Sequence, residues 1–293
     1  MKNRLRSARE TVAGDMVVTQ EIVNYGVPLG VAIVTALGCW RCLPESVARR
    51  YAAAAAVAAA FFVGYAMLPS WAELAPKRHW QWLPYLGVAA MILGPIGLAD
   101  GVSKIERFML YLLLAITAAW LLVPTWASLQ PPRSTYVPLL SGYLFMLMVL
   151  LQPLPGRVSG KLFCILLSLV ALATALTIAA FISLRYGRVS AVAGTAVVGC
   201  CVAAFFQKDQ LTIRGVMPIY AVLIGGLAFV GFVEPEMPLF GVLVMPAAPL
   251  ALWVVGWLPF VKSNERLLMV VQTTAVLVVL VIGVSASYLV HAQ

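Results

Sequence analysis

The stretch MILGPIGLADGVSKIER, residues 91–107, decides how the chain folds, because it joins an apolar run to the densest cluster of charge in the interior of the sequence. Its first part belongs to the apolar run 83–99, which Gly94-Pro95 interrupts. Proline removes a backbone donor and clashes with the preceding helical turn. The run is therefore a candidate re-entrant segment, one that enters the membrane and leaves it on the same side.

The composition is that of a membrane protein. Of 293 residues, 62% are hydrophobic and 11% are charged, and the mean hydropathy is +0.97. A soluble domain needs about a quarter of its residues charged to cover its surface, so most of this surface must face lipid. The apolar runs cover residues 22–43, 50–69, 83–99, 107–128, 135–152, 161–184, 189–206, 212–233, 237–261 and 266–290.

Each run except 83–99 is near or above the roughly 17 to 25 residues that a spanning helix needs. Backbone amides in hydrocarbon must be satisfied within their own segment, so the runs are predicted to be helices. The sequence predicts an all-α, polytopic transmembrane bundle of nine or ten helices with short loops. Residues 1–21 are polar and are expected to be loose or to lie on the surface, and residues 22–293 form a single transmembrane domain.

The distribution of Lys and Arg tests the number of crossings. If all ten runs cross, the two sides hold 9 and 11 of the 20 basic residues. If 83–99 does not cross, they hold 14 and 6, and if 22–43 does not cross, they hold 15 and 5. The positive-inside rule favours either nine-helix arrangement, and the Gly-Pro break favours omitting 83–99.

The three arrangements agree on the second half of the chain. The basic loops 153–161, 207–214 and 261–267 are predicted to be cytoplasmic. The Glu234–Glu236 loop and the C-terminus are then on the non-cytoplasmic side of the cell membrane, which the chain crosses several times.

Asp100, Lys104, Glu106 and Arg107 are the first candidates for a functional site. Charged groups at membrane depth usually mark a solute or ion path, and a broken helix exposes backbone groups for binding. The simpler interpretation is a cytoplasmic loop, in which Asp100 begins the turn and water solvates the charges. We rank that interpretation first.

Pro246 and Pro249 are the second candidates, because they fall near the middle of the run 237–261. Two prolines leave backbone carbonyls without partners, so a neighbouring helix or a cavity must satisfy them. The resulting kink either lines a pathway or only improves packing. We find no internal repeat that would pair this break with an equivalent one in the first half of the chain.

Cys39 and Cys42 form a C-x-x-C pair at the end of the first apolar run. Arg41 lies between them, and helical spacing lets the two sulfurs meet, so thiol–disulfide exchange is chemically feasible. Two unconnected thiols at the membrane surface are the simpler interpretation.

The interior of every apolar run lacks Asp, Glu, Lys, Arg and His. The two histidines, His79 and His291, lie in a loop and near the terminus, so the sequence predicts no metal site, cofactor or catalytic residue. The basic residues are scattered through the loops, which argues against nucleic acid as a partner despite the net charge of +9.

These observations favour a non-enzymatic integral membrane protein. It is either a permease-like carrier of an apolar or neutral solute or the membrane subunit of a larger assembly. The alternative is a membrane thiol–disulfide oxidoreductase that uses Cys39 and Cys42. The expected partners are the lipid bilayer and other membrane subunits, and the sequence does not identify a small-molecule substrate.

Overall fold

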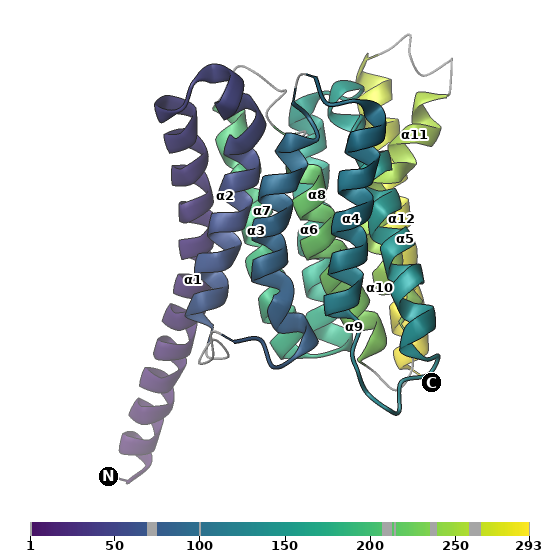
Figure 1. Ribbon diagram of the computed structural model, residues 1–293. Helices are drawn as coiled ribbons and strands as arrows, with labels where there is room; N and C mark the ends of the chain where they lie inside the picture. Colours follow the sequence, from purple (N-terminus) through teal and green to yellow (C-terminus); the bar gives the residue numbers. More distant parts are fainter. Residues whose placement is uncertain are drawn as a thin grey trace.

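The computed structural model describes residues 2–68, 75–99, 101–206, 213, 215–234, 239–257 and 265–292, with side chains from Gln20 onward and without that of Arg49. All regular structure in these ranges is helical, and the helices stand side by side in one bundle (Figure 1). The predicted all-α fold is therefore confirmed.

The helices follow the predicted apolar runs. In the first half of the chain they are α1 (Lys2–Cys42), α2 (Glu45–Met67), η2 (His79–Trp82), α3 (Leu83–Ile96), α4 (Lys104–Leu122) and α5 (Arg133–Leu151). In the second half they are η3 (Leu154–Gly156), α6 (Gly160–Phe181), α7 (Leu184–Phe205), α8 (Met217–Tyr220), η5 (Ala221–Gly225), α9 (Gly226–Val233), α10 (Phe240–Val244), η6 (Met245–Leu250), α11 (Ala251–Gly256) and α12 (Glu265–His291).

Seven helices within the described ranges are long and apolar enough to cross a membrane. They are Gln20–Cys42, Arg50–Met67, Lys104–Leu122, Arg133–Gly156, Gly160–Phe181, Leu184–Phe205 and Glu265–His291. Two shorter apolar helical segments, Met217–Val233 and Phe240–Gly256, complete the second half of the bundle. Lengths and composition of this kind are compatible with a membrane protein.

The segment α3 is continuous through the Gly94-Pro95 pair, which falls in its last turn. It runs beside its neighbours from one end of the bundle to the other (Figure 1). Gly94 is needed because a Cβ there would lie 2.9 Å from the Pro218 ring of α8. The pair therefore belongs to a close helix contact at the end of a full pass.

The two ends of the chain lie at the same end of the bundle (Figure 1). We call this end the terminal end and the other the opposite end. The polar residues 2–21 continue α1 without a break, and the start of this helix extends beyond the bundle (Figure 1).

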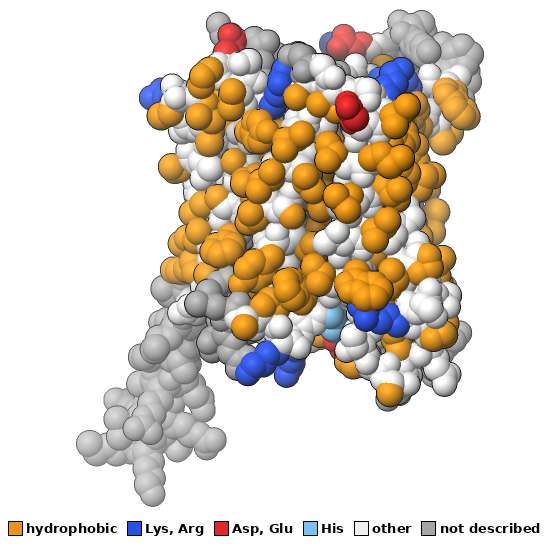
Figure 2. Space-filling view, viewed as in Figure 1, with side chains coloured by type: hydrophobic (Ala, Val, Ile, Leu, Met, Phe, Trp, Pro, Cys, Tyr) orange, Lys and Arg blue, Asp and Glu red, His pale blue; other side chains and the backbone are white. Residues whose placement is uncertain are grey.

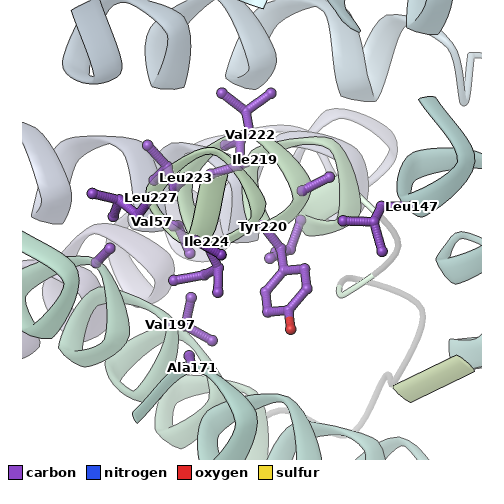
Figure 3. Close-up of a cluster of buried hydrophobic side chains, with 14 of the residues drawn as sticks. Val57, Leu147, Ala171, Val197, Ile219, Tyr220, Val222, Leu223, Ile224 and Leu227 are labelled. Atoms are coloured by element: carbon purple, nitrogen blue, oxygen red, sulfur yellow. The ribbon is translucent and has the colours of Figure 1, made fainter. Parts of the chain in front are cut away.

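The pass formed by α8, η5 and α9 lies at the centre of the bundle. Every residue from Met217 to Phe232 is buried. Figure 3 shows its side chains pointing to several sides, with Val57 of α2, Leu147 of α5, Ala171 of α6 and Val197 of α7 around them. A helix that is apolar on all sides belongs inside a bundle in this way.

Small residues allow several helices to meet backbone to backbone. Gly199 of α7 lies against α1, where an added Cβ would be 2.6 Å from the carbonyl oxygen of Leu29. Gly241 of α10 meets the backbone of Gly283 in α12 closely enough that no Cβ fits between them. Such contacts are typical of helices packed in membranes.

The outer surface has an apolar middle and charged ends. Figure 2 shows hydrophobic side chains over the middle of the visible face, with Lys, Arg, Asp and Glu near its two ends. Large apolar residues on different helices are highly exposed, including Ile105 at 71%, Leu176 at 70% and Val281 at 62%. This distribution suits a protein whose sides contact hydrocarbon.

Candidate functional site

A cavity of about 760 Å³ opens at the terminal end of the bundle, and we call it the vestibule. Its walls come from the segment around η2, the end of α4, the start of α5, the start of α7 and the end of α9. The lining residues are Lys77, Arg78, His79, Trp80, Trp82, Trp120, Leu121, Val123, Pro124, Thr125, Trp126, Arg133, Ser183, Arg185, Tyr186 and Glu234.

Local hydrogen bonds shape the segments that carry these side chains. The side-chain oxygen of Gln81 accepts hydrogen bonds from the backbone N–H groups of Lys77 (2.7 Å) and Arg78 (2.9 Å), which closes the turn before α3. The hydroxyl of Ser183 accepts a hydrogen bond from the backbone N–H of Arg185 (3.2 Å) and caps α7. Both devices satisfy backbone donors that the helix starts would leave unpaired.

Aromatic rings form the deep wall of the vestibule. Trp80 is 1% exposed and packs edge to face on Tyr186, with ring centres 6.0 Å apart. The His79 ring packs in the same manner on Trp126, at 5.4 Å. Edge-to-face contacts at these distances add to the stability that ring burial provides.

Two arginines stack on indole rings of the same wall. The Arg133 guanidinium lies 4.4 Å from the Trp120 ring centre and donates a hydrogen bond to the Trp120 carbonyl oxygen. The Arg185 guanidinium lies 5.3 Å from the Trp80 ring centre. Both distances lie within the range of favourable cation–π contacts. Stacking leaves guanidinium N–H groups at the ring edges able to donate hydrogen bonds to anions, although one of those on Arg133 is already bound to Trp120.

Glu234 is the single carboxylate among the described lining residues, against the cations Lys77, Arg78, Arg133 and Arg185. The Tyr186 hydroxyl donates a hydrogen bond to Glu234 Oε1. Among the described lining residues, the three arginines outnumber this one carboxylate, which already has a donor.

His79 is neutral at pH 7. Burial, followed by the nearby positive charge of Arg78, lowers the pKa of His79 to about 4. Its Nε2 lies 3.8 Å from Glu234 Oε1, but the neutral ring makes this a polar contact and not an ion pair at neutral pH.

Three buried nitrogen atoms of the walls have no hydrogen-bond partner among the described residues. They are His79 Nε2, Trp80 Nε1 and Arg133 Nε. A buried donor without a partner costs about 1–3 kcal/mol. Groups of this kind call for a bound ligand or ordered water.

The predicted charged cluster lies at the opposite end of the bundle. Asp100 is outside the described residues. Lys104 and Glu106 are exposed in the first turn of α4, where Ser103 and Glu106 form a reciprocal capping box with bonds of 2.6 Å and 3.2 Å. Arg107 donates to the carbonyl oxygen of Gly97. These contacts give Glu106 and Arg107 a role in starting α4 and holding the preceding turn.

Pro246 and Pro249 lie in the buried 3₁₀ segment η6, between α10 and α11. Carbonyl oxygens beside this break are bound by two tyrosines: Tyr143 donates to Leu243 at 2.8 Å, and Tyr220 donates to Pro246 at 3.1 Å. At these two carbonyls, side chains of other helices supply the hydrogen-bond donors.

Cys39 and Cys42 are free thiols at the end of α1; Cys39 is partly exposed and Cys42 is exposed. Among the residues whose structure is described, no group of three or more His, Cys, Asp or Glu side chains is placed to hold a metal ion.

Sequence reasoning missed the vestibule. It proposed no binding role for Trp80, Trp82, Lys77 or Arg78, and it assigned Glu234 only to a loop. Tyr186 and Glu234 are 48 positions apart, and nothing in their local sequence indicates contact. The one available signal was the cluster of Trp with Lys and Arg in residues 77–82.

Comparison of the chain with protein-family models, with curated proteins and with solved structures gave no match. The functional argument therefore depends on the residues themselves.

Proposed function

We propose that the protein is a permease-like carrier in the cell membrane. The proposal depends on one observation, that two neighbouring passes in the bundle are interrupted at their middle and joined there. The central pass changes from α8 to the π-helical turn η5, and the pass beside it changes from α10 to the 3₁₀ segment η6. The Tyr220–Pro246 hydrogen bond joins the two interruptions.

Interrupted helices supply what a carrier needs. Irregular backbone within a membrane is tolerated only where protein or a cavity satisfies it, and π-turns and 3₁₀ segments often mark functional hinges. Because Pro246 and Pro249 lack the N–H groups of a regular helix, α10 and α11 are not tied by a continuous hydrogen-bond ladder. The two halves of this pass are therefore able to tilt separately, which would open the bundle first at one end and then at the other.

The orientation in the membrane is part of the proposal. With ten passes, the end that holds the loop 153–161 carries 11 Lys and Arg, against 9 at the terminal end. This difference favours a cytoplasmic opposite end, with Glu234 and the C-terminus on the non-cytoplasmic side. The vestibule then faces the exterior.

The test uses an accessible thiol at the break and needs no knowledge of the solute. All five cysteines are replaced by alanine, and Ala247→Cys is introduced into η6. The purified protein is reconstituted in vesicles and treated with a membrane-impermeant maleimide from the outside or from the lumen. A carrier exposes this position to each side in turn, so both treatments should label it.

Arg157→Cys, in the connection between α5 and α6, is the control and should react from one side only. Labelling of Ala247→Cys from neither side or from a single side would overturn the carrier and favour a membrane subunit without a pathway.

A further inference from the structure

We propose that the vestibule is a binding site for an organic phosphate, a ligand that presents a phosphate group beside a flat ring. This inference names the substrate class of the carrier proposed above. It depends on the vestibule alone, so it can fail or hold separately from transport.

The charge of the walls selects an anion. Three arginines, Arg78, Arg133 and Arg185, line the cavity, whereas Glu234 is the only carboxylate among its described lining residues and accepts from Tyr186. Guanidinium groups hold phosphate through paired N–H donors, and two of the three arginines are stacked on indole rings at 4.4 Å and 5.3 Å. A dianionic phosphate balances this excess better than a single carboxylate does.

The aromatic wall selects the rest of the ligand. Trp80, Trp126 and Tyr186 line the same cavity as the cations, and the buried Trp80 Nε1 and Arg133 Nε have no partner among the described residues. A flat ring can stack against such a wall while a phosphate oxygen supplies the missing acceptor after small side-chain rotations. The volume of about 760 Å³ is within the range of small-molecule sites.

The experiment measures binding to the full-length protein in a non-ionic detergent, by calorimetry and by quenching of tryptophan fluorescence. The probes are phenyl phosphate, inorganic phosphate, benzyl alcohol and a short-chain phosphatidic acid. Phenyl phosphate should bind at least about tenfold more tightly than inorganic phosphate and benzyl alcohol, since each of these lacks one of the two recognised parts. Its affinity should fall as salt concentration rises.

Arg133→Gln and Arg185→Gln should each weaken phenyl phosphate binding by about 10- to 100-fold, because a charge-assisted hydrogen bond is lost. Arg157→Gln is the matched control. The Arg157 guanidinium also stacks on an indole, 4.1 Å from the Trp253 ring centre, but in a different cavity. It should leave the affinity unchanged. Melting temperatures show whether each variant is folded.

The outcomes are distinct. The proposed site is overturned if the wild-type protein binds neither phenyl phosphate nor phosphatidic acid. It is also overturned if all three arginine variants weaken phenyl phosphate binding equally. Equal affinity for phosphate and phenyl phosphate removes the aromatic part of the proposal. Binding of phosphatidic acid alone assigns the same chemistry to a lipid headgroup. If phenyl phosphate binds but Ala247→Cys is not labelled from both sides, the binding site is supported and the carrier function is contradicted.

Discussion

The Tyr220 hydroxyl donates a hydrogen bond of 3.1 Å to the carbonyl oxygen of Pro246, and both residues are buried. Tyr220 precedes the π-turn η5, and its ring projects from the central pass on the side opposite Val222 (Figure 3). The bond therefore connects the central pass to the point where the neighbouring pass is interrupted by proline.

Tyr220→Phe should destabilise the protein by about 1–3 kcal/mol, because it leaves the buried Pro246 carbonyl without a donor. The measurement is thermal unfolding in detergent at pH 7. Tyr288→Phe, at a residue that is 59% exposed on α12, is the control and should change the melting temperature little. A melting temperature for Tyr220→Phe equal to that of the control would show that the bond contributes no stability.

Gly199→Ala should destabilise the α1–α7 contact by about 1–3 kcal/mol, the usual cost of overpacking. The added Cβ would lie 2.6 Å from the Leu29 carbonyl oxygen and 2.7 Å from the Ala32 side chain. Gly30→Ala is matched to it, because a Cβ at Gly30 meets nothing within 4 Å. Alanine is the better helix former, so Gly30→Ala should preserve or raise the melting temperature. The reverse order would contradict the packing described for α1 and α7.

Much of the fold follows from hydropathy, because hydrocarbon forces each long apolar run to be a helix. The passes α6 and α12 lie almost where their runs predict. Whether α3 passes through the bundle could not be predicted from hydropathy or charge. Its Gly-Pro pair looks like a break in sequence, but the reason for Gly94 is its contact with Pro218, more than a hundred positions away.

The vestibule could not be predicted from the sequence either, because its contacts also join residues that are far apart in the chain. Trp80 and Tyr186, or Tyr186 and Glu234, meet only because η2, the start of α7 and the end of α9 lie at one end of the bundle. Local patterns predict helices, whereas these contacts depend on how the helices are arranged. The candidates Pro246 and Pro249 were identifiable because proline disrupts a helix whatever surrounds it.

Stability should fall as the pH is lowered from 7 towards 4, partly because of His79. In the folded protein its pKa is lowered to about 4, so the unfolded chain takes up a proton near pH 6.5 that the folded protein does not. Folding stability is therefore lost over this window, by about 1 kcal/mol between pH 7 and pH 5.5.

His79→Gln should reduce the dependence of the melting temperature on pH in that range. His291→Gln, at an exposed residue near the C-terminus, serves as the control. The range stops at pH 5.5, above the ordinary pKa values of carboxyl groups. A wild-type melting temperature that stays constant or rises as the pH falls to 5.5 would contradict the neutral, buried state of His79.

Both ends of the chain should lie on the same side of the membrane, because α1 begins and α12 ends at the same end of the bundle (Figure 1). Epitope tags at the N- and C-termini should become accessible together in spheroplasts, and a cysteine at Arg157 should be accessible only from the other side. Tags on opposite sides would support a nine-crossing arrangement instead.

The contact between Gly241 and Gly283 has a mechanical consequence. Since no side chain separates the two backbones, any movement that brought a neighbouring side chain between α10 and α12 would cause a steric clash. Bending at η6 should therefore move α10 and the last turns of α12 together. A fluorophore attached to the C-terminus would report that displacement from outside the bundle.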